Sequence, residues 1–164
     1  MHSRIIQISQ EPMEADEYIS PWLYCDDHWF VPQIADYVAE DENRDESIEW
    51  FFDCLSQASS FFDTFEEDGQ RGFILKDGFR DAYFSEMHQA FINALQDLAD
   101  YSSYEHFRDG ELGGKLFSLK EAYDEKLGMY VESNESGLIT LTEFLRGAEI
   151  DRRYFIGGTL DYHF

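Results

Sequence analysis

Basic residues are scarce in this 164-residue chain, which has 12 Lys and Arg against 35 Asp and Glu and a formal net charge of −23. The first lysine is Lys76. Nucleic-acid binding needs cationic side chains that displace the counterions around phosphate, and anionic membrane surfaces attract basic segments in the same way. The composition therefore argues against direct nucleic-acid binding and against membrane association. It favours a basic protein partner, a divalent cation, or no partner at all.

Cysteine and long apolar runs are also scarce. The two cysteines cannot form a framework of several disulfides, and Cys54 lies in an apolar helical pattern typical of a reduced core thiol. Every apolar run is shorter than the roughly 20 residues that span a membrane, and the first residues lack the pattern of a signal peptide. We therefore expect a cytoplasmic protein.

Aromatic residues are abundant, with 15 Phe, 10 Tyr and 3 Trp, and 43% of the chain is hydrophobic. This composition argues against disorder and is sufficient for one real core. We expect a single globular domain over residues 1–164 without a separate linker. Predicted helices and strands are mixed without regular β-α-β alternation, which favours an α+β fold. Its expected form is two to three main amphipathic helices packed on a small, mostly antiparallel sheet with hairpins.

Two segments have apolar residues at helical spacing. In residues 82–101 the stripe consists of Phe84, Met87, Phe91, Leu95 and Leu98. Residues 46–60 have a similar stripe, and a third helix is expected over 116–127. We expect the other elements to pack on the phenylalanine side of 82–101. The core would then be built on this helix, on 46–60 and on the closing strands.

Strand patterns fill much of the remaining chain. We expect a strand at 4–8, one hairpin from 61–65 and 72–76, a second from 129–133 and 137–141, and a closing strand at 153–164. Gly157 and Gly158 predict a bend or bulge in that last strand. Pro32 predicts the start of a short helix over 33–40. The aromatic-rich stretch 22–30 is either core or an exposed contact surface, and the sequence leaves this open.

Residues 132–143 resemble an EF-hand calcium loop over a dozen positions. Such a loop needs oxygen side chains at its first, third and fifth places, Gly at the sixth and Glu at the twelfth. The matching residues are Glu132, Asn134, Ser136, Gly137 and Glu143. The resemblance implies a Ca²⁺ site with Glu132, Asn134, Ser136 and Glu143 as ligands. This cation-binding module is our alternative hypothesis.

The same stretch also fits a β-hairpin with Asn134 to Gly137 as its turn. Glu132 stands where a calcium loop has Asp, and Gly128 interrupts the helix that should enter the loop. A second loop at 67–78 has Gly78 at the final ligand place, which cannot coordinate. We therefore favour the hairpin.

Catalytic and cofactor motifs are not evident, so we lean against an enzyme and predict no cofactor other than Ca²⁺. An enzyme of unrecognised family is the third hypothesis. Neither cysteine lies in a nucleophile motif, and the five histidines form no metal-binding pair. Cys25, Asp26, Asp27 and His28 are adjacent donors that could supply part of a transition-metal site. We favour an ordinary polar loop there.

The main functional signal is the acidic N-terminal half, since residues 1–70 hold 18 Asp and Glu but only two Arg. The residues expected to meet a basic partner are Asp41, Glu42, Asp45, Glu46, Glu66, Glu67 and Asp68. We therefore predict a non-enzymatic interaction or inhibitor protein. In its sharpest form it would mimic DNA, as do antirestriction and anti-CRISPR inhibitors, which are similar to this chain in charge and size. The competing interpretation is a solvated surface that maintains solubility.

Overall fold

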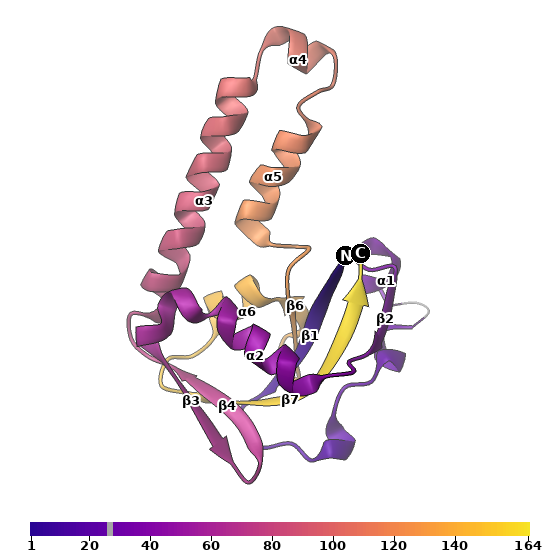
Figure 1. Ribbon diagram of the computed structural model, residues 1–164, viewed down its shortest axis with the longest axis vertical. Helices are drawn as coiled ribbons and strands as arrows, with labels where there is room; N and C mark the ends of the chain where they lie inside the picture. Colours follow the sequence, from indigo (N-terminus) through magenta and orange to yellow (C-terminus); the bar gives the residue numbers. More distant parts are fainter. Residues whose placement is uncertain (26–27) are drawn as a thin grey trace.

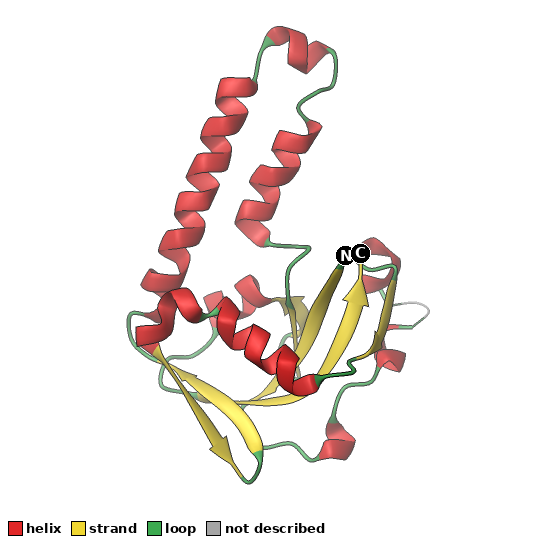
Figure 2. Ribbon diagram, in the orientation of Figure 1, coloured by secondary structure: helices red, strands yellow, loops and turns green. Residues whose placement is uncertain are grey.

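The computed structural model describes residues 1–25 and 28–164, and in this part of the chain seven strands form one sheet (Figures 1 and 2). Asp26 and Asp27 of the predicted donor cluster lie outside the described residues. The strands along the sheet are β3 (Phe62–Glu67), β4 (Gln70–Leu75), β7 (Arg153–His163), β1 (His2–Ser9), β5 (Tyr130–Ser133) and β6 (Gly137–Thr140). A further strand, β2 (Tyr37–Glu40), pairs with the later part of β7. Among the strand pairs of the described residues only β1–β5 is parallel, so the expected α+β fold with a mostly antiparallel sheet and hairpins is confirmed.

A bulge at Gly157–Gly158 changes the face of the sheet to which the side chains of β7 point, so this strand contributes to the cores on both faces. The pairing with β1 shifts there, since Ile6 lies opposite Thr159 whereas Ile8 lies opposite Ile156. A Cβ atom on Gly158 would come within 3.0 Å of the Ile19 backbone nitrogen, so this close approach favours glycine. The bend or bulge predicted from the two glycines is confirmed.

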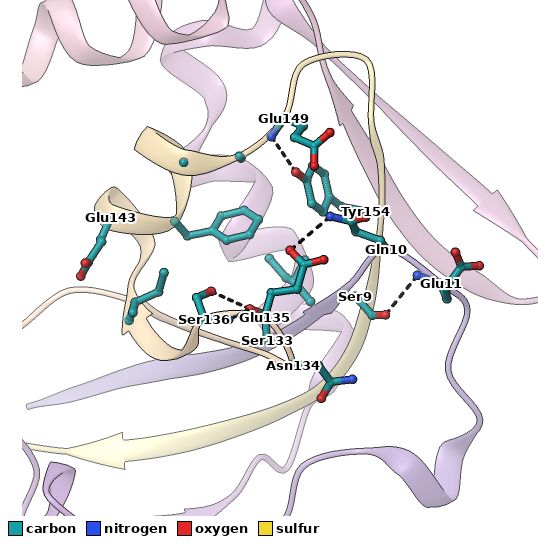
Figure 3. Close-up of a pocket in the computed structure, with 15 residues that line it drawn as sticks. Ser9, Gln10, Glu11, Ser133, Asn134, Glu135, Ser136, Glu143, Glu149 and Tyr154 are labelled. Atoms are coloured by element: carbon teal, nitrogen blue, oxygen red, sulfur yellow. Dashed lines mark hydrogen bonds between the residues drawn. The ribbon is translucent and has the colours of Figure 1, made fainter.

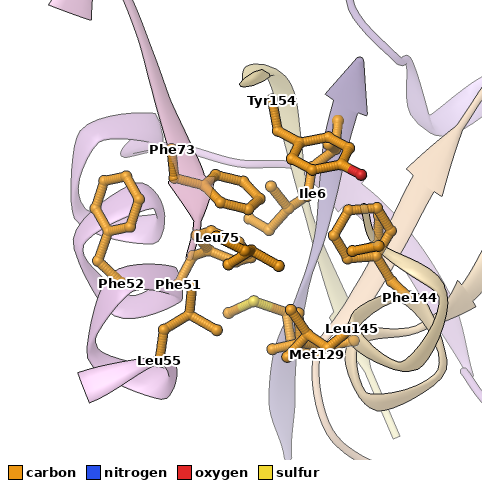
Figure 4. Packing of buried hydrophobic residues seen from close by; sticks show 14 of the residues in the cluster. Ile6, Phe51, Phe52, Leu55, Phe73, Leu75, Met129, Phe144, Leu145 and Tyr154 are labelled. Atoms are coloured by element: carbon orange, nitrogen blue, oxygen red, sulfur yellow. The ribbon is translucent and has the colours of Figure 1, made fainter. Parts of the chain in front are cut away.

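The first face of the sheet carries the larger core (Figure 4). It is covered by α2 (Arg44–Cys54), the 3₁₀ segment η3 (Ser56–Phe61) and α6 (Leu141–Gly147). The wholly buried side chains here include Ile6, Ile48, Phe51, Leu55, Phe73 and Leu145. Burying each such side chain contributes roughly 1.5–3 kcal/mol. The predicted helix at 46–60 therefore does support the core, although its regular part ends at Cys54.

The second face is covered by the N-terminal segment, which includes η1 (Ala15–Glu17), η2 (Pro21–Tyr24) and a short helical segment, α1 (Phe30–Gln33). Tyr24 and Phe30 are buried there, whereas Trp22 is 83% exposed. The aromatic-rich stretch is therefore partly core and partly surface. The helix predicted over 33–40 is wrong, because residues 37–40 form β2, and pairing with β7 outweighs the local helical pattern.

Helices α3 (Phe79–Tyr101) and α5 (Gly113–Asp124) pack on each other and form an arm, with α4 (Tyr104–Arg108) at its far end (Figure 1). In α3 only Phe79 and Tyr83 are buried. The expectation that the other elements pack on the phenylalanine side of 82–101 therefore holds only for the first turns of the helix. Its first turns reach the core, and the rest projects away from the sheet, where α5 alone covers one side (Figure 2). No helix in the described part of the chain is long and apolar enough to cross a membrane.

Candidate interaction groove

The acids predicted at the start of α2 lie at its N-terminus, where Glu42, Asp45 and Glu46 are exposed. Asn43 is the N-cap, and its side chain accepts the Glu46 N–H at 3.3 Å. Asp45 and Glu46 occupy the first turn, where negative charge is stabilised by the helix dipole. Part of this charge therefore has a structural role.

Asp41 differs from its neighbours because its side chain is only 3% exposed. Burial alone would raise the pKa of this carboxyl. Hydrogen bonds from Ser47, Thr159 and the Asn43 N–H, together with the charge of Arg4, hold the pKa below its ordinary value. The carboxylate is therefore used inside the fold and is not presented as surface charge.

The remaining predicted partner-binding acids form the tip of the β3–β4 hairpin. Glu66, Glu67 and Asp68 are exposed, and Asp68 turns the chain with a φ of +50°. Glu67 forms an ion pair with Arg153. The structure therefore brings these three acids together, but part of their charge is neutralised.

The loop at 132–143 is a hairpin, as favoured from the sequence. Strands β5 and β6 pair from Tyr130–Thr140 to Ser133–Gly137. The Tyr24 hydroxyl donates to Glu132 over 2.9 Å, and Thr140 caps α6 by accepting the Glu143 N–H at 3.1 Å. Glu132, the predicted first ligand, and Thr140 within the loop are therefore used in structural hydrogen bonds.

A pocket of about 500 Å³ lies beside this hairpin (Figure 3). Asn134, Ser136 and Glu143 line it, but Glu132 does not. Gln10 donates to Glu135 across the pocket over 3.3 Å. Within residues 1–25 and 28–164, no group of three or more His, Cys, Asp and Glu side chains is placed to hold a metal ion.

A second, larger cavity of about 760 Å³ lies between the arm and the body, and we call it the arm groove. Its apolar lining includes Trp50, Met87, Phe117, Met129, Leu141 and Phe164. Its acids are Glu86, Glu121 and Glu125, and none of the described residues that line it is Lys or Arg. The groove thus combines an apolar floor with negative charge.

Helical spacing accounts for two of the groove walls. Phe117, Glu121 and Glu125 follow one another at steps of four residues, so Phe117 and Glu121 lie on one side of α5 and Glu125 continues this row at its C-cap. On α3, Glu86 and Ala90 are separated by the same step and also line the groove. Each wall therefore places a carboxylate next to an apolar side chain.

The three carboxylates differ in how far they are already paired. Glu86 is exposed, and no described residue forms a hydrogen bond or ion pair with its carboxylate. Glu121 accepts the Leu127 N–H at 3.1 Å, and Glu125 accepts the Thr142 hydroxyl at 2.5 Å. Because a carboxylate has about four lone-pair sites, all three retain capacity to accept from a ligand.

The floor of the groove is adaptable and partly open. Met87 and Met129 supply flexible, polarisable side chains, and Trp50 is 40% exposed with the Arg4 guanidinium 5.6 Å from its ring centre. Cys54 also lines the groove, and burial together with the charge of Glu125 raises the pKa of its thiol to about 11. Cys54 is therefore a reduced, weakly nucleophilic lining residue.

Sequence reasoning did not find the arm groove. Its residues come from both ends of the chain and from α2, α3 and α5, and only the fold brings them together. One local signal was available, since Phe117, Glu121 and Glu125 are spaced like one side of a helix. No family model, curated protein or solved structure matches this chain.

Proposed function

We propose that this protein is a non-enzymatic interaction protein that binds a basic, partly apolar segment of another protein in the arm groove. The observation that carries the proposal is the composition of that groove. An apolar floor lies beside Glu86, Glu121 and Glu125, and the described lining contains no Lys or Arg. A partner segment with apolar side chains and Lys or Arg beside them is complementary to both features.

The two features have different energetic roles. Exposed apolar side chains such as Phe117, which is 53% exposed, gain hydrophobic free energy when a partner covers them. Charge complementarity mainly accelerates association and excludes wrong partners. The net charge of −23 extends this attraction beyond the groove, and salt weakens it.

DNA mimicry is less well supported than binding in the arm groove. A mimic needs an unbroken face of carboxylates that imitates the regular charge of the duplex, about one charge per 1.7 Å. Near the acidic hairpin β3–β4, three basic residues interrupt the negative charge by pairing with acids. The pairs are Asp63 with Lys76, Glu49 with Arg71 and Glu67 with Arg153. We therefore propose the arm groove, and not the acidic hairpin, as the site that binds the partner.

The test compares two variants that lose the same number of charges. Glu86→Gln with Glu121→Gln changes the groove, and Glu42→Gln with Asp45→Asn changes the exposed acids near α2. The probe is a fluorescently labelled synthetic peptide of about 14 residues containing only Leu and Lys, followed by anisotropy. We expect the groove variant to weaken binding about tenfold or more, and the α2 variant to change it less than threefold.

Equal weakening by the two variants would contradict the proposal, because attraction would then depend only on net charge. A stronger effect of the α2 variant would move the site to the N-terminal acids. Salt titration adds a second readout. Loss of groove carboxylates should reduce the dependence of the dissociation constant on salt more than loss of the α2 acids does.

A further inference from the structure

We infer that the occupant of the arm groove is a basic amphipathic α-helix of two to three turns, whose apolar side packs on the body and on the apolar side chains of the arm, and whose Lys or Arg side chains reach the carboxylates of the arm. The inference rests on the proposed function, because it specifies the conformation of the partner segment at the same site. Length, backbone chemistry, packing and charge each support it.

The groove walls have the length of a short helix. On α3 the lining runs from Tyr83 to Ala90, and on α5 it runs from Phe117 through Glu121 to Glu125 at the C-cap. Both stretches are about two helical turns, or roughly 10–12 Å at 1.5 Å per residue. A partner helix lying along them would place anchors at i, i+3 or i+4, and i+7.

The backbone chemistry of the walls favours a helix over an extended strand. A strand bound to a protein draws much of its affinity from unpaired amides and carbonyls at a sheet edge. The amides and carbonyls inside α3 and α5 are bonded within their own helices, so these walls offer side chains only. A helical occupant satisfies its own backbone and needs only side-chain contacts.

In the described part of the chain, no third helix covers the apolar side chains that α3 and α5 leave open. No described residue from 84 to 128 is fully buried, although this range contains Phe84, Met87, Phe91, Leu98 and Phe117. Two helices can cover only one side of each other, so apolar side chains facing the groove stay exposed. A third helix placed against α3, α5 and the body would cover Met87 and Phe117 together.

Charge decides between a basic helix and a second copy of this chain. A second copy carries the same net charge of −23, and its arm would bring further carboxylates towards Glu86 and Glu121. Like charges brought together in an interface cost free energy. Lys or Arg side chains about four residues apart would instead reach Glu121 and Glu125, which have that spacing.

The test uses three labelled peptides of identical Leu and Lys composition and about 14 residues. The first places Leu along one side of a helix, the second scrambles the order so that Leu surrounds the helix, and the third keeps the Leu and Lys of the first with two internal prolines inserted. We expect the first to bind about tenfold or more tightly than the others, and to gain helical circular dichroism on binding. Binding should depend on Glu86 and Glu121.

Trp50 supplies an independent readout in the groove. In a background with Trp22→Phe and Trp29→Phe, Trp50 is the single tryptophan, and we expect its emission to shift to the blue when the first peptide covers it. Phe117→Ser should weaken this binding about tenfold, whereas Phe107→Ser at the exposed end of the arm should not. Each phenylalanine is largely exposed, so both variants should fold.

The outcomes separate the inference from the proposed function. If the proline peptide binds as tightly as the amphipathic one and both depend on Glu86 and Glu121, the helix inference fails and the groove function stands. If no peptide depends on these glutamates, both fail. If a second copy of the chain is the occupant, sedimentation will show a dimer that Phe117→Ser dissociates, and the basic-helix inference is overturned.

Discussion

The Thr142 hydroxyl donates to Glu125 Oε2 over 2.5 Å, and this bond joins α6 of the body to the C-terminal end of the arm. Thr142 is wholly buried, and Glu125 is the C-cap of α5 with a φ of +46°. A second contact reinforces the joint, because Arg146 donates to the Tyr123 carbonyl over 3.0 Å. The position of α5, and hence one wall of the arm groove, depends on these contacts.

Thr142→Val should therefore loosen the arm. Valine keeps the shape of the side chain but leaves the half-buried Glu125 carboxylate without its donor, which costs about 1–3 kcal/mol. We expect the free energy of unfolding in urea to fall by that amount. Amide exchange in α5 should become faster than in the wild type, by a larger factor than amide exchange in α2. Ser118→Ala removes an exposed hydroxyl within α5 itself and should change neither quantity. Unchanged exchange in Thr142→Val would show that the bond does not hold the arm.

Acid should reveal the buried role of Asp41. Because the pKa of this carboxyl is held below its ordinary value of 3.8, its ionised form stabilises the fold above that pH. That contribution is lost as the pH falls below about 4 and the carboxyl becomes protonated. Asp41→Asn should lower the unfolding free energy at pH 7 by about 1–3 kcal/mol and flatten its decline in acid.

The measurement for Asp41 is denaturant unfolding between about pH 7 and pH 2.5, a range that extends on both sides of the ordinary carboxyl pKa of 3.8. Glu42→Gln is the matched control, because Glu42 is adjacent but exposed, and its removal should change stability by less than about 0.5 kcal/mol. Equal effects of the two substitutions would mean that Asp41 acts only through net charge.

Local patterns in the sequence predicted most of the secondary structure. Alternating apolar residues and turn signals gave β1, both hairpins and β7 with its bulge, because these features depend on neighbours along the chain. The strand at Tyr37–Glu40 was missed because its stability comes from pairing with residues more than a hundred positions away. Pairing over such distances leaves little trace in local periodicity.

The role of α3 could not be read from its sequence for a different reason. The spacing of Phe84, Met87 and Phe91 shows that one side of the helix is apolar, but it does not say what covers that side. In the fold α5 covers part of it and the arm groove leaves part open. The total charge likewise led us to predict a basic partner, but with 35 acids it could not select among surfaces, and the predicted contact residues were N-terminal acids that do not line the groove.

The two cysteines should differ strongly in reactivity towards a disulfide reagent such as DTNB. Cys25 is exposed, whereas burial raises the pKa of Cys54 to about 11. At pH 8 only about one thousandth of Cys54 is then thiolate, the reactive form. We expect one fast and one slow thiol, and the fast phase should disappear in Cys25→Ser. Two equally fast phases would contradict the burial of Cys54.

Divalent cations should stabilise the protein without using the hairpin at 132–143. At a net charge of −23, both Ca²⁺ and Mg²⁺ should raise the unfolding midpoint by screening repulsion between carboxylates. Glu143→Ala removes a favourable charge in the first turn of α6, so it should lower stability by about 0.3–1 kcal/mol in each condition. Thermal unfolding with chelator, Ca²⁺ and Mg²⁺ should therefore give equal ion effects in both proteins. A shift specific to Ca²⁺ that Glu143→Ala abolishes would instead establish the calcium loop, because a ligand bound only to the folded state raises the midpoint by mass action.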